Sequence, residues 1–474
     1  MTYSPARRRA LLYAVIVRLW RRFASCKDIC LPFRQFAPSV GRVIRVLCLT
    51  LLCAFAALAA HAQKWKYDFI VPDNGNFVQA IHAANRRPDK SKRYRIFVRS
   101  SNYRIHGEQT SITTTVDGKQ VTIPSPMTTL TAPNTSICGE SWHNTQIESR
   151  PQYEGLSITS TLFINGADST YLQDIELWCN FRDDPTLYDS RSVAVNEKNC
   201  HGNVFKNVSL VGLQNTYWTN DGGTTYLEDC RLIGTVDFIC GGGTIYFNHC
   251  DLKLANRGDA GKCDIICAPA TEAALPYGYV FTDCYIDGPA HYEGRYLLGR
   301  PWENAPRAVF INCCMNRTPA LEGWGTRPGA LPALFAEYNS ANGYFELLDM
   351  SQRRTAFPDA SGALHDTGRD PTLSDEEVER YGVTDVFGGW DPRDQSEQVP
   401  PPVLTMKGRQ ITWDDIPEAG CYAVLRDRKI VAFTTQPLYN VPAGTREGSC
   451  YTVRCANQMG GLGAPSDVIV YPQR

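Results

Sequence analysis

The chain has 474 residues, of which 43% are hydrophobic and 20% are charged, so it has ample apolar material for a packed core and exceeds one typical domain. The whole chain carries a net charge of −1, but from residue 63 onward it has 38 basic and 48 acidic residues, a net charge of −10. This composition predicts a globular protein of several parts and argues against a nucleic-acid partner.

Residues 1–62 are predicted to be a leader that ends in a signal peptide. Two arginines near residue 42 precede an uninterrupted small-apolar run over residues 46–60, and Ala60-His61-Ala62 fits the cleavage pattern of secretory signals. The alternative, a membrane anchor, is disfavoured because the run is short and no stop-transfer charges follow it directly. We therefore expect an exported protein, periplasmic or secreted, that starts at Gln63 and keeps no stable membrane span.

Residues 67–99 predict a strand, a short amphipathic helix over residues 77–84, and a second strand. The residues that follow predict a solenoid. The end of a solenoid needs a cap because its last coil has no neighbour to bury its apolar face. We expect residues 67–99 to be that cap.

A seven-residue pattern, apolar-apolar-x-polar-small apolar-x-apolar, recurs six times between residues 171 and 315. Each copy has the apolar-polar alternation of a strand and is rich in Tyr, Phe, Val and Ile. It usually has Asp or Asn at the position where a turn is expected. Successive fifth positions are 33, 22, 20, 34 and 29 residues apart, so the shortest spacings fit one coil of a β-solenoid and the longer ones imply loops. These ladder positions are Ile175, Val208, Cys230, Cys250, Cys284 and Cys313.

The predicted fold is all-β: a right-handed parallel β-helix over residues 130–350, with the six ladder side chains stacked inside. Fourteen of the 18 cysteines lie after residue 62, and those of the ladder are expected to pack as small hydrophobes. The Cys263-x₃-Cys267 spacing and the Cys313-Cys314 pair do not match a structural zinc site. We predict no metal and no organic cofactor.

Beyond Ser351 the ladder ends and a polar stretch begins. It contains a helix predicted to begin near Ser374, with Glu377 in capping-box register. Three prolines, residues 400–402, then mark a linker.

The strand signals of residues 403–474 resemble a fibronectin type III β-sandwich. The predicted organisation is a β-helix domain over residues 63–398, a linker over residues 399–402, and a separate C-terminal domain. Such a domain would be a spacer or a binding module.

The ladder spacing also aligns polar and charged residues that are candidates for catalysis. Asn215 and Asp237 each lie seven residues after a ladder position, so they occupy equivalent positions on neighbouring coils, about 4.8 Å apart. Arg300 and Asp237 each precede a ladder position by thirteen residues, which puts the long arginine side chain on the same face.

A carboxylate, an amide and a guanidinium on one face suit acyl transfer. The carboxylate attacks an ester carbonyl, neighbouring donors stabilise the oxyanion, and the arginine keeps the attacking group ionised. The spacing alone fits equally well with ordinary turn caps and a salt bridge.

Two motifs make the chain resemble the pectinesterase family. Residues 234–241, Gly-Thr-Val-Asp-Phe-Ile-Cys-Gly, look like the family's signature around its nucleophilic aspartate, and residues 298–302, Leu-Gly-Arg-Pro-Trp, match its arginine-tryptophan motif. Gln214-Asn215-Thr216 falls where the family has Gln-Asp-Thr, and Trp324 begins a segment similar to a later aromatic one. The resemblance runs from about residue 67 to residue 392.

The resemblance implies a pectin methylesterase acting on methylated homogalacturonan, as a monomer. It implies that Asp237 is the nucleophile, Arg300 its partner and Gln214 an oxyanion donor. It also implies that Trp302, with Trp324, forms a platform for a sugar ring.

The chain departs from the family pattern at two positions. Asn215 stands where the family has its general acid/base aspartate, and Arg191 stands where it usually has an oxyanion glutamine. An asparagine can donate a hydrogen bond to the oxyanion but cannot give a proton to methoxide, and loss of a general acid typically costs roughly 10²–10⁴-fold in rate. Arg191 is expected to compensate in part by binding the developing negative charge.

Two alternatives remain open from the sequence. One is a catalytically weak pectin-binding protein that keeps the groove and its aromatic residues. The other is a different activity on the same fold, such as a lyase, a glycosidase or another carbohydrate esterase, because a fold does not fix a function. A glycosidase would need paired acidic residues, whereas the partner of Asp237 is Asn215.

Overall fold

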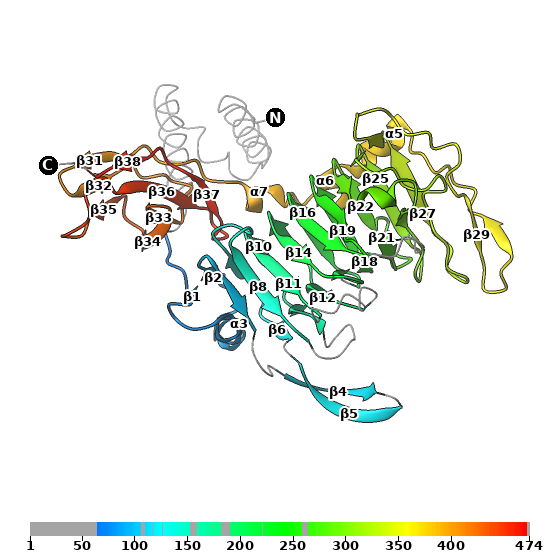
Figure 1. The fold of residues 1–474 in the computed structure, drawn as a ribbon, viewed down its shortest axis with the longest axis horizontal. Coiled ribbons are helices and arrows are strands. Elements are labelled where there is room, and N and C mark those ends of the chain that lie inside the picture. The colour runs from blue at the N-terminus through cyan, green and yellow to red at the C-terminus, as the bar shows by residue number, and fades with distance from the viewer. Residues whose placement is uncertain are drawn as a thin grey trace, which may run out of the picture. The chain divides into compact units, whose positions relative to one another are not determined.

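The computed structural model describes residues 64–105, 110–116, 118–125, 127–151, 159–181, 190–219, 221–257 and 264–471 (Figure 1). The predicted leader and signal peptide lie outside the described residues. The described residues belong to one compact unit. Within the described ranges, no helix is long and apolar enough to cross a membrane.

Three sheets of parallel strands build the body of the molecule (Figure 1). The first has the strands β1 (Phe69–Val71), β2 (Tyr94–Val98), β7 (Thr135–Cys138), β10 (Tyr171–Gln173), β13 (Asn203–Lys206), β16 (Thr224–Glu228), β19 (Thr244–Asn248), β22 (Tyr279–Thr282), β25 (Arg307–Ile311) and β27 (Leu334–Tyr338). The second has β3 (Ser101–Arg104), β8 (Thr145–Ser149), β11 (Glu176–Cys179), β14 (Ser209–Val211), β17 (Arg231–Gly234), β20 (Asp251–Leu254), β23 (Tyr285–Asp287), β26 (Cys314–Met315) and β28 (Ala341–Asn342). The third has β6 (Thr128–Leu130), β9 (Leu162–Asn165), β12 (Val195–Lys198), β15 (Tyr217–Thr219), β18 (Val236–Gly241), β21 (Ile265–Pro269) and β24 (Leu297–Gly299).

The chain visits the three sheets in turn. The strands β13, β14 and β15 form one coil, and β16, β17 and β18 form the next, each strand pairing in parallel with its equivalent. This is the predicted parallel β-helix, which is confirmed.

The turn between the first and second sheets explains the ladder pattern. The residue before each ladder position has a positive φ of 52–56°, a conformation that Asn and Asp tolerate better than most residues. The ladder side chain then points into the solenoid, where each of the six is at most 1% exposed. The predicted inward stack is confirmed. The residues with positive φ are Asp174, Asn207, Asp229, His249, Asp283 and Asn312.

The N-terminal end of the solenoid is capped as predicted. Helix α3 (Phe77–Arg86) begins at Asn76, which forms a capping box with Gln79. The helix buries Phe77 and Ile81 in the same apolar cluster as the solenoid interior. A long antiparallel hairpin, β4 (Thr110–Val116) and β5 (Lys119–Ser125), projects from the body near this end (Figure 1).

The polar stretch after the ladder holds a short hairpin and short helices. The hairpin consists of β29 (Ala356–Pro358) and β30 (Leu364–Asp366). Helix α5 (Asp375–Val378) begins at Ser374 with the predicted capping box to Glu377. The same stretch contains the short helices η5 (Glu379–Tyr381), α6 (Val383–Val386) and α7 (Arg393–Ser396), whereas η4 (Ala290–Tyr292) lies within the solenoid, between β23 and β24.

The C-terminal residues form two antiparallel sheets. One contains β31 (Thr405–Lys407), β32 (Gln410–Thr412) and β35 (Leu438–Asn440), and the other contains β33 (Cys421–Arg426), β34 (Lys429–Thr434), β36 (Cys450–Ala456), β37 (Leu462–Pro465) and β38 (Ile469–Val470). Trp413, Tyr422 and Tyr451 belong to one apolar core cluster of this region. Two sheets around one core are the layout of a β-sandwich. The likeness to fibronectin type III and the domain boundaries stay predictions.

These sheets pack directly on the first coils of the solenoid, which the linker composition did not predict. The ring of Phe433 lies 4.8 Å from that of Tyr67 and 4.9 Å from that of Phe97. The Tyr67 hydroxyl donates to the backbone oxygen of Gly460 at 2.6 Å, and Arg454 donates to that of Glu140 at 3.0 Å.

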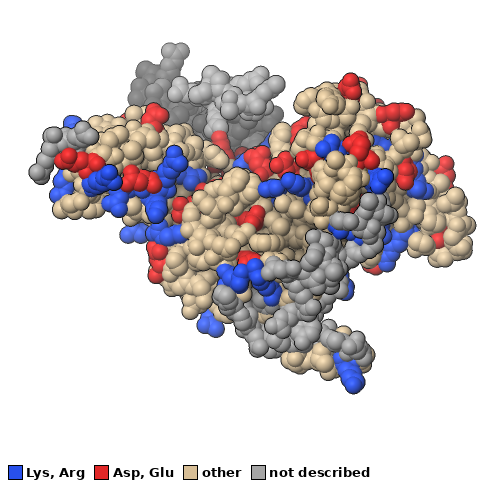
Figure 2. All heavy atoms as spheres, in the orientation of Figure 1, with Lys and Arg blue, Asp and Glu red and all other residues tan. Residues whose placement is uncertain are grey.

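On the face drawn in Figure 2, basic and acidic side chains are interspersed.

Candidate active site

Asp237 sits on a β-bulge in the third sheet. The register between β18 and β21 shifts between Val236 and Ile239, and Asp237 has a φ of 49°. A bulge redirects a side chain out of the regular alternation, and such backbone irregularities cluster at functional sites. Phe238 stays in the core, while the carboxylate of Asp237, only 1% exposed, reaches the wall of a cleft.

Arg300 holds the Asp237 carboxylate by two hydrogen bonds. Nε of Arg300 donates to Oδ1 at 3.0 Å, and Nη2 donates to Oδ2. Arg300 directly follows β24, and its backbone N–H donates to the backbone oxygen of Cys267 at 3.0 Å. The structure therefore brings together the two residues that the ladder spacing placed on one face.

The environment of Asp237 acts on its proton affinity in two directions. Burial raises the pKa of the Asp237 carboxyl above its ordinary value, while the hydrogen bonds and charge of Arg300 and the charge of Arg327 oppose that rise. Without Arg300 the carboxyl would hold its proton to a still higher pH. The pair thus presents a poorly solvated carboxylate that depends on its arginine for ionisation.

Asn215 lies opposite Asp237 on the preceding coil. The strands β15 and β18 pair Tyr217 with Ile239, and Asn215 stands two residues before Tyr217. Its side-chain Nδ2 donates to the backbone oxygen of Asp237 at 3.2 Å and to Sγ of Cys240 at 2.9 Å.

This contact fixes the orientation of the Asn215 amide. A backbone carbonyl oxygen can only accept a hydrogen bond, so the amide atom beside it must be the nitrogen. Both N–H groups are then engaged, and Oδ1 is the atom left for other partners. Because both N–H groups are engaged within the protein here, donation by Asn215 to an oxyanion stays a prediction.

The cleft beside Asp237 has a volume of about 330 Å³. Its lining includes five of the predicted site residues: Arg191, Gln214, Asn215, Asp237 and Trp302. Arg191 and Gln214 form a parallel bridge between neighbouring coils. Gln214 is half-buried, and its backbone oxygen accepts from the N–H of Ser192 at 2.9 Å.

Trp302 is fixed in the cleft by two arginines. The guanidinium carbon of Arg327 lies 3.5 Å from the centroid of the indole ring, and that of Arg300 lies 5.4 Å from the same centroid. Arg327 also donates from Nη1 to the backbone oxygen of Trp302 at 2.9 Å. These contacts hold the indole of Trp302 at the cleft by cation–π attraction.

Trp324 does not contribute to the cleft, which corrects the predicted platform. Its side chain is fully buried and stacks on Phe335 with 4.6 Å between the ring centroids. The indole belongs to the apolar cluster of the solenoid core, so it cannot contact a sugar.

Sequence reasoning missed several residues that line the cleft, among them Trp218, Asp221, Cys240 and Glu303. Trp218 pairs with Cys240 in the register of β15 and β18. These two residues lie three positions after Asn215 and Asp237, so counting from the ladder positions could have identified both. Burial, followed by the charge of Glu272, raises the pKa of the Asp221 carboxyl. Among the described residues, no group of His, Cys, Asp and Glu side chains could hold a metal ion.

The chain is similar in sequence to proteins named as pectinesterases. The sequence model of the family described as Pectinesterase matches residues 68–344. Pectinesterase A of Dickeya dadantii (strain 3937) is 30% identical over 208 residues, which are 40% of this chain and 54% of that protein. The chain spans between about a fifth and about half of the length of the curated relatives it matches.

Solved structures share the fold. A pectin methylesterase from Erwinia chrysanthemi superposes with a TM-score of 0.54 at 24% identity, covering 69% of this chain and 99% of that one. A pectin methylesterase in complex with a hexasaccharide gives a TM-score of 0.53 at 24% identity with the same coverage. Since the family model matches more than half of the residues, this chain belongs to the pectinesterase family.

Proposed function

We propose that this protein is a pectin methylesterase, which hydrolyses galacturonate methyl esters of pectin to a free carboxylate and methanol. The observation that carries the proposal is the buried Asp237 carboxylate, held by Arg300 at the wall of an open cleft, in a chain of the pectinesterase family. The similar structure with a bound hexasaccharide supports an oligosaccharide as the ligand of such a cleft.

In the first step, an Asp237 carboxylate oxygen attacks the ester carbonyl carbon and forms a new C–O bond. The carbonyl oxygen becomes negatively charged, and donors in the cleft stabilise it. Gln214 and Arg191 are the proposed donors because both line the cleft and bridge neighbouring coils. Trp302 is the proposed platform for the sugar ring.

In the second step, the tetrahedral intermediate expels methoxide, which takes a proton from water and leaves as methanol. The acyl group remains on Asp237 as an anhydride. Water then attacks the galacturonoyl carbonyl, the anhydride bond breaks, and the products are the sugar carboxylate, the Asp237 carboxylate and protons released to solvent. Asn215 has Oδ1 available as an acceptor, so its proposed role is to orient a water molecule rather than to donate a proton.

A second candidate is a pectin-binding protein with weak or no esterase activity. It is favoured by Asn215, which cannot supply the proton that departing methoxide requires. The cleft, Trp302 and the arginines would then serve binding alone. Export of the mature chain, which the leader predicts, suits either candidate.

Methanol release from highly methylated pectin decides between the two. We expect release by the chain from residue 63 onward, and a loss on the order of 10⁴–10⁶-fold in Asp237→Asn, the range found when a nucleophile or its partner is removed. Pectin binding without methanol release by the unmodified protein would favour the second candidate. Full release by Asp237→Asn would exclude the proposed nucleophile.

A further inference from the structure

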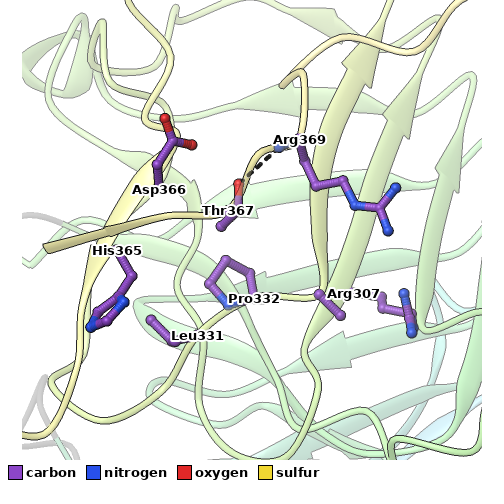
Figure 3. A pocket seen from close by; sticks show the side chains of 8 residues that line it. Arg307, Leu331, Pro332, His365, Asp366, Thr367 and Arg369 are labelled. Atoms are coloured by element: carbon purple, nitrogen blue, oxygen red, sulfur yellow. Dashed lines mark hydrogen bonds between the residues drawn. The ribbon is translucent and has the colours of Figure 1, made fainter.

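A second pocket, of about 310 Å³, lies beside the β29–β30 hairpin (Figure 3). Arg307 and Arg369 lie on one side of it, Leu331 and Pro332 form an apolar part of its wall, and His365 lies across from the arginines. The proposed esterase chemistry uses none of these residues.

The two guanidinium groups have no carboxylate partner within the described part of the chain. Arg307 donates from Nε to the backbone oxygen of Leu275 at 3.2 Å. Arg369 has only a backbone contact, from its N–H to Oγ1 of Thr367 at 3.3 Å (Figure 3). Two cations on one wall without an anion between them favour a negatively charged ligand.

The nearby acidic side chains are engaged elsewhere. Asp366 accepts from the backbone N–H of Gly368 at 2.9 Å, and Figure 3 shows it on the opposite side of the pocket from both arginines. Asp359 lies 2.7 Å from Nε2 of His365. These contacts leave the two guanidinium charges for a ligand.

The phenol of Tyr381 lies within the electrostatic influence of Arg307 and Arg369, which lower its pKa, and of Glu377, which raises it. Burial and Tyr277 outweigh the influence of the arginines and raise the pKa of Tyr381 to about 12. The phenol is therefore neutral at physiological pH and does not neutralise the arginines.

The apolar part of the pocket wall favours an anionic ligand that also has an apolar surface. Leu331 is 39% exposed, and Pro332 stands beside it. A bare inorganic anion gains nothing from such a surface, whereas a hexuronate has both a carboxylate and an apolar ring face.

Two short chain segments link this pocket to the cleft. Trp302 lines the cleft and Arg307 lines the pocket. Because these residues are five positions apart in the chain, their Cα atoms are separated by at most about 18 Å. Arg327 packs on Trp302, and Leu331 follows four residues later. An oligosaccharide of a few units could contact both places.

We propose that the pocket between Arg307 and Arg369 binds a free uronate carboxylate on a de-esterified stretch of the polysaccharide whose methyl esters are cleaved at Asp237. The identity of that polymer rests on the proposed function; the anionic site itself does not. De-esterified product would then remain attached to the protein while neighbouring ester groups enter the cleft.

Binding without turnover tests this site. In the Asp237→Asn background, the affinity for unesterified oligogalacturonate is measured by calorimetry with Arg307→Gln and Arg369→Gln, singly and together, and with Arg446→Gln as an exposed control. We expect about a tenfold or larger loss of affinity in the double variant and a weaker dependence on salt, with no change in the control. Affinity for fully methylated oligomer should not change.

Unchanged affinity for the unesterified oligomer in correctly folded variants would overturn the site. If Arg307→Gln fails to fold, Arg369→Gln alone decides, because that side chain is exposed. Competition by inorganic phosphate as strong as that by oligogalacturonate would overturn the uronate assignment. Failure of the unmodified protein to release methanol would overturn the proposed function instead, since the binding measurement requires no turnover.

Discussion

The ionisation of Asp237 depends chiefly on Arg300. Burial raises the pKa of this carboxyl, and Arg300 is the strongest influence against that rise. The nucleophile must be deprotonated to attack, so activity should increase as pH rises through the pKa of Asp237. Removing the arginine moves that pKa upward and also removes two hydrogen bonds that orient the carboxylate.

We therefore expect Arg300→Gln to reduce methanol release by roughly 10³-fold or more and to shift the acid limb of the kcat/KM profile to higher pH. The profile is measured for this variant, the unmodified protein and the exposed control Arg446→Gln. A loss of activity with an unshifted acid limb would mean that Arg300 acts on substrate rather than on the ionisation of Asp237.

Replacing the Asn215 amide by an acid should restore a proton donor to the site. In Asn215→Asp, a carboxyl would face the backbone oxygen of Asp237 and lie beside its carboxylate, both of which favour the protonated acid. That acid could give its proton to methoxide, so turnover should rise, by up to about 10²-fold.

Steady-state methanol release at neutral pH measures the change, and Asn215→Ala is the matched control that lacks both the acid and the acceptor. Equal rates for Asn215→Asp and the unmodified protein would indicate that water protonates methoxide efficiently at this site. The gain in Asn215→Asp should fade at high pH, once the new acid loses its proton.

The turn between the first and second sheets sets the geometry of every coil. Asn312 has a φ of 53°, a conformation that costs a residue with an ordinary side chain roughly 1–2 kcal/mol. We expect Asn312→Ala to lower the free energy of unfolding by about 1 kcal/mol and Asn312→Gly to leave it nearly unchanged, because glycine adopts this conformation readily.

Chemical denaturation of the two variants makes that comparison. Asn312 also contacts Asn339 at 3.4 Å, a long hydrogen bond that both substitutions remove equally. Equal destabilisation by alanine and glycine would assign the effect to this contact and not to the backbone.

Much of this architecture could be predicted from sequence because it repeats. A turn residue at one position of each coil, usually Asn or Asp, marks the turn, the inward ladder and the register that aligns Asn215 with Asp237. The bulge at Asp237 and the direction of the Asn215 amide occur once, so no repeat could reveal them. The burial of Trp324 could not be predicted either, because the sequence pattern around a tryptophan does not distinguish one that faces the core from one that faces a cleft.

The C-terminal sheets pack against the first coils and so form part of the solenoid's end. Phe433 contacts Tyr67 and Phe97, and the composition of the linker contained no sign of this interface. The contact depends on the tertiary arrangement of residues more than 300 positions apart, which no local pattern encodes.

Loss of this interface should destabilise the protein without altering its chemistry. We expect Phe433→Ala to lower the free energy of unfolding by about 1–3 kcal/mol, less than for a fully buried ring, while kcat stays unchanged because the site lies on other coils. Leu438→Ala, at a 37% exposed position in the same region, is the control. Deletion of residues 403–474 should have a larger effect on thermal stability, and an unchanged unfolding temperature would show that the sheets are dispensable to the solenoid.

The ladder has a consequence for how the protein must be made. Cys230, Cys250, Cys284 and Cys313 follow one another on successive coils as free thiols. Neighbouring strands lie about 4.8 Å apart, within the Cα separations of about 4.4–6.8 Å that a disulfide accepts. In the folded state burial raises the pKa of the Cys250 thiol far above its ordinary value, which suppresses the reactive thiolate. A chain that meets an oxidant before its coils have closed has no such protection. Mispaired crosslinks would then form between coils, so synthesis under reducing conditions should give the higher yield of native protein.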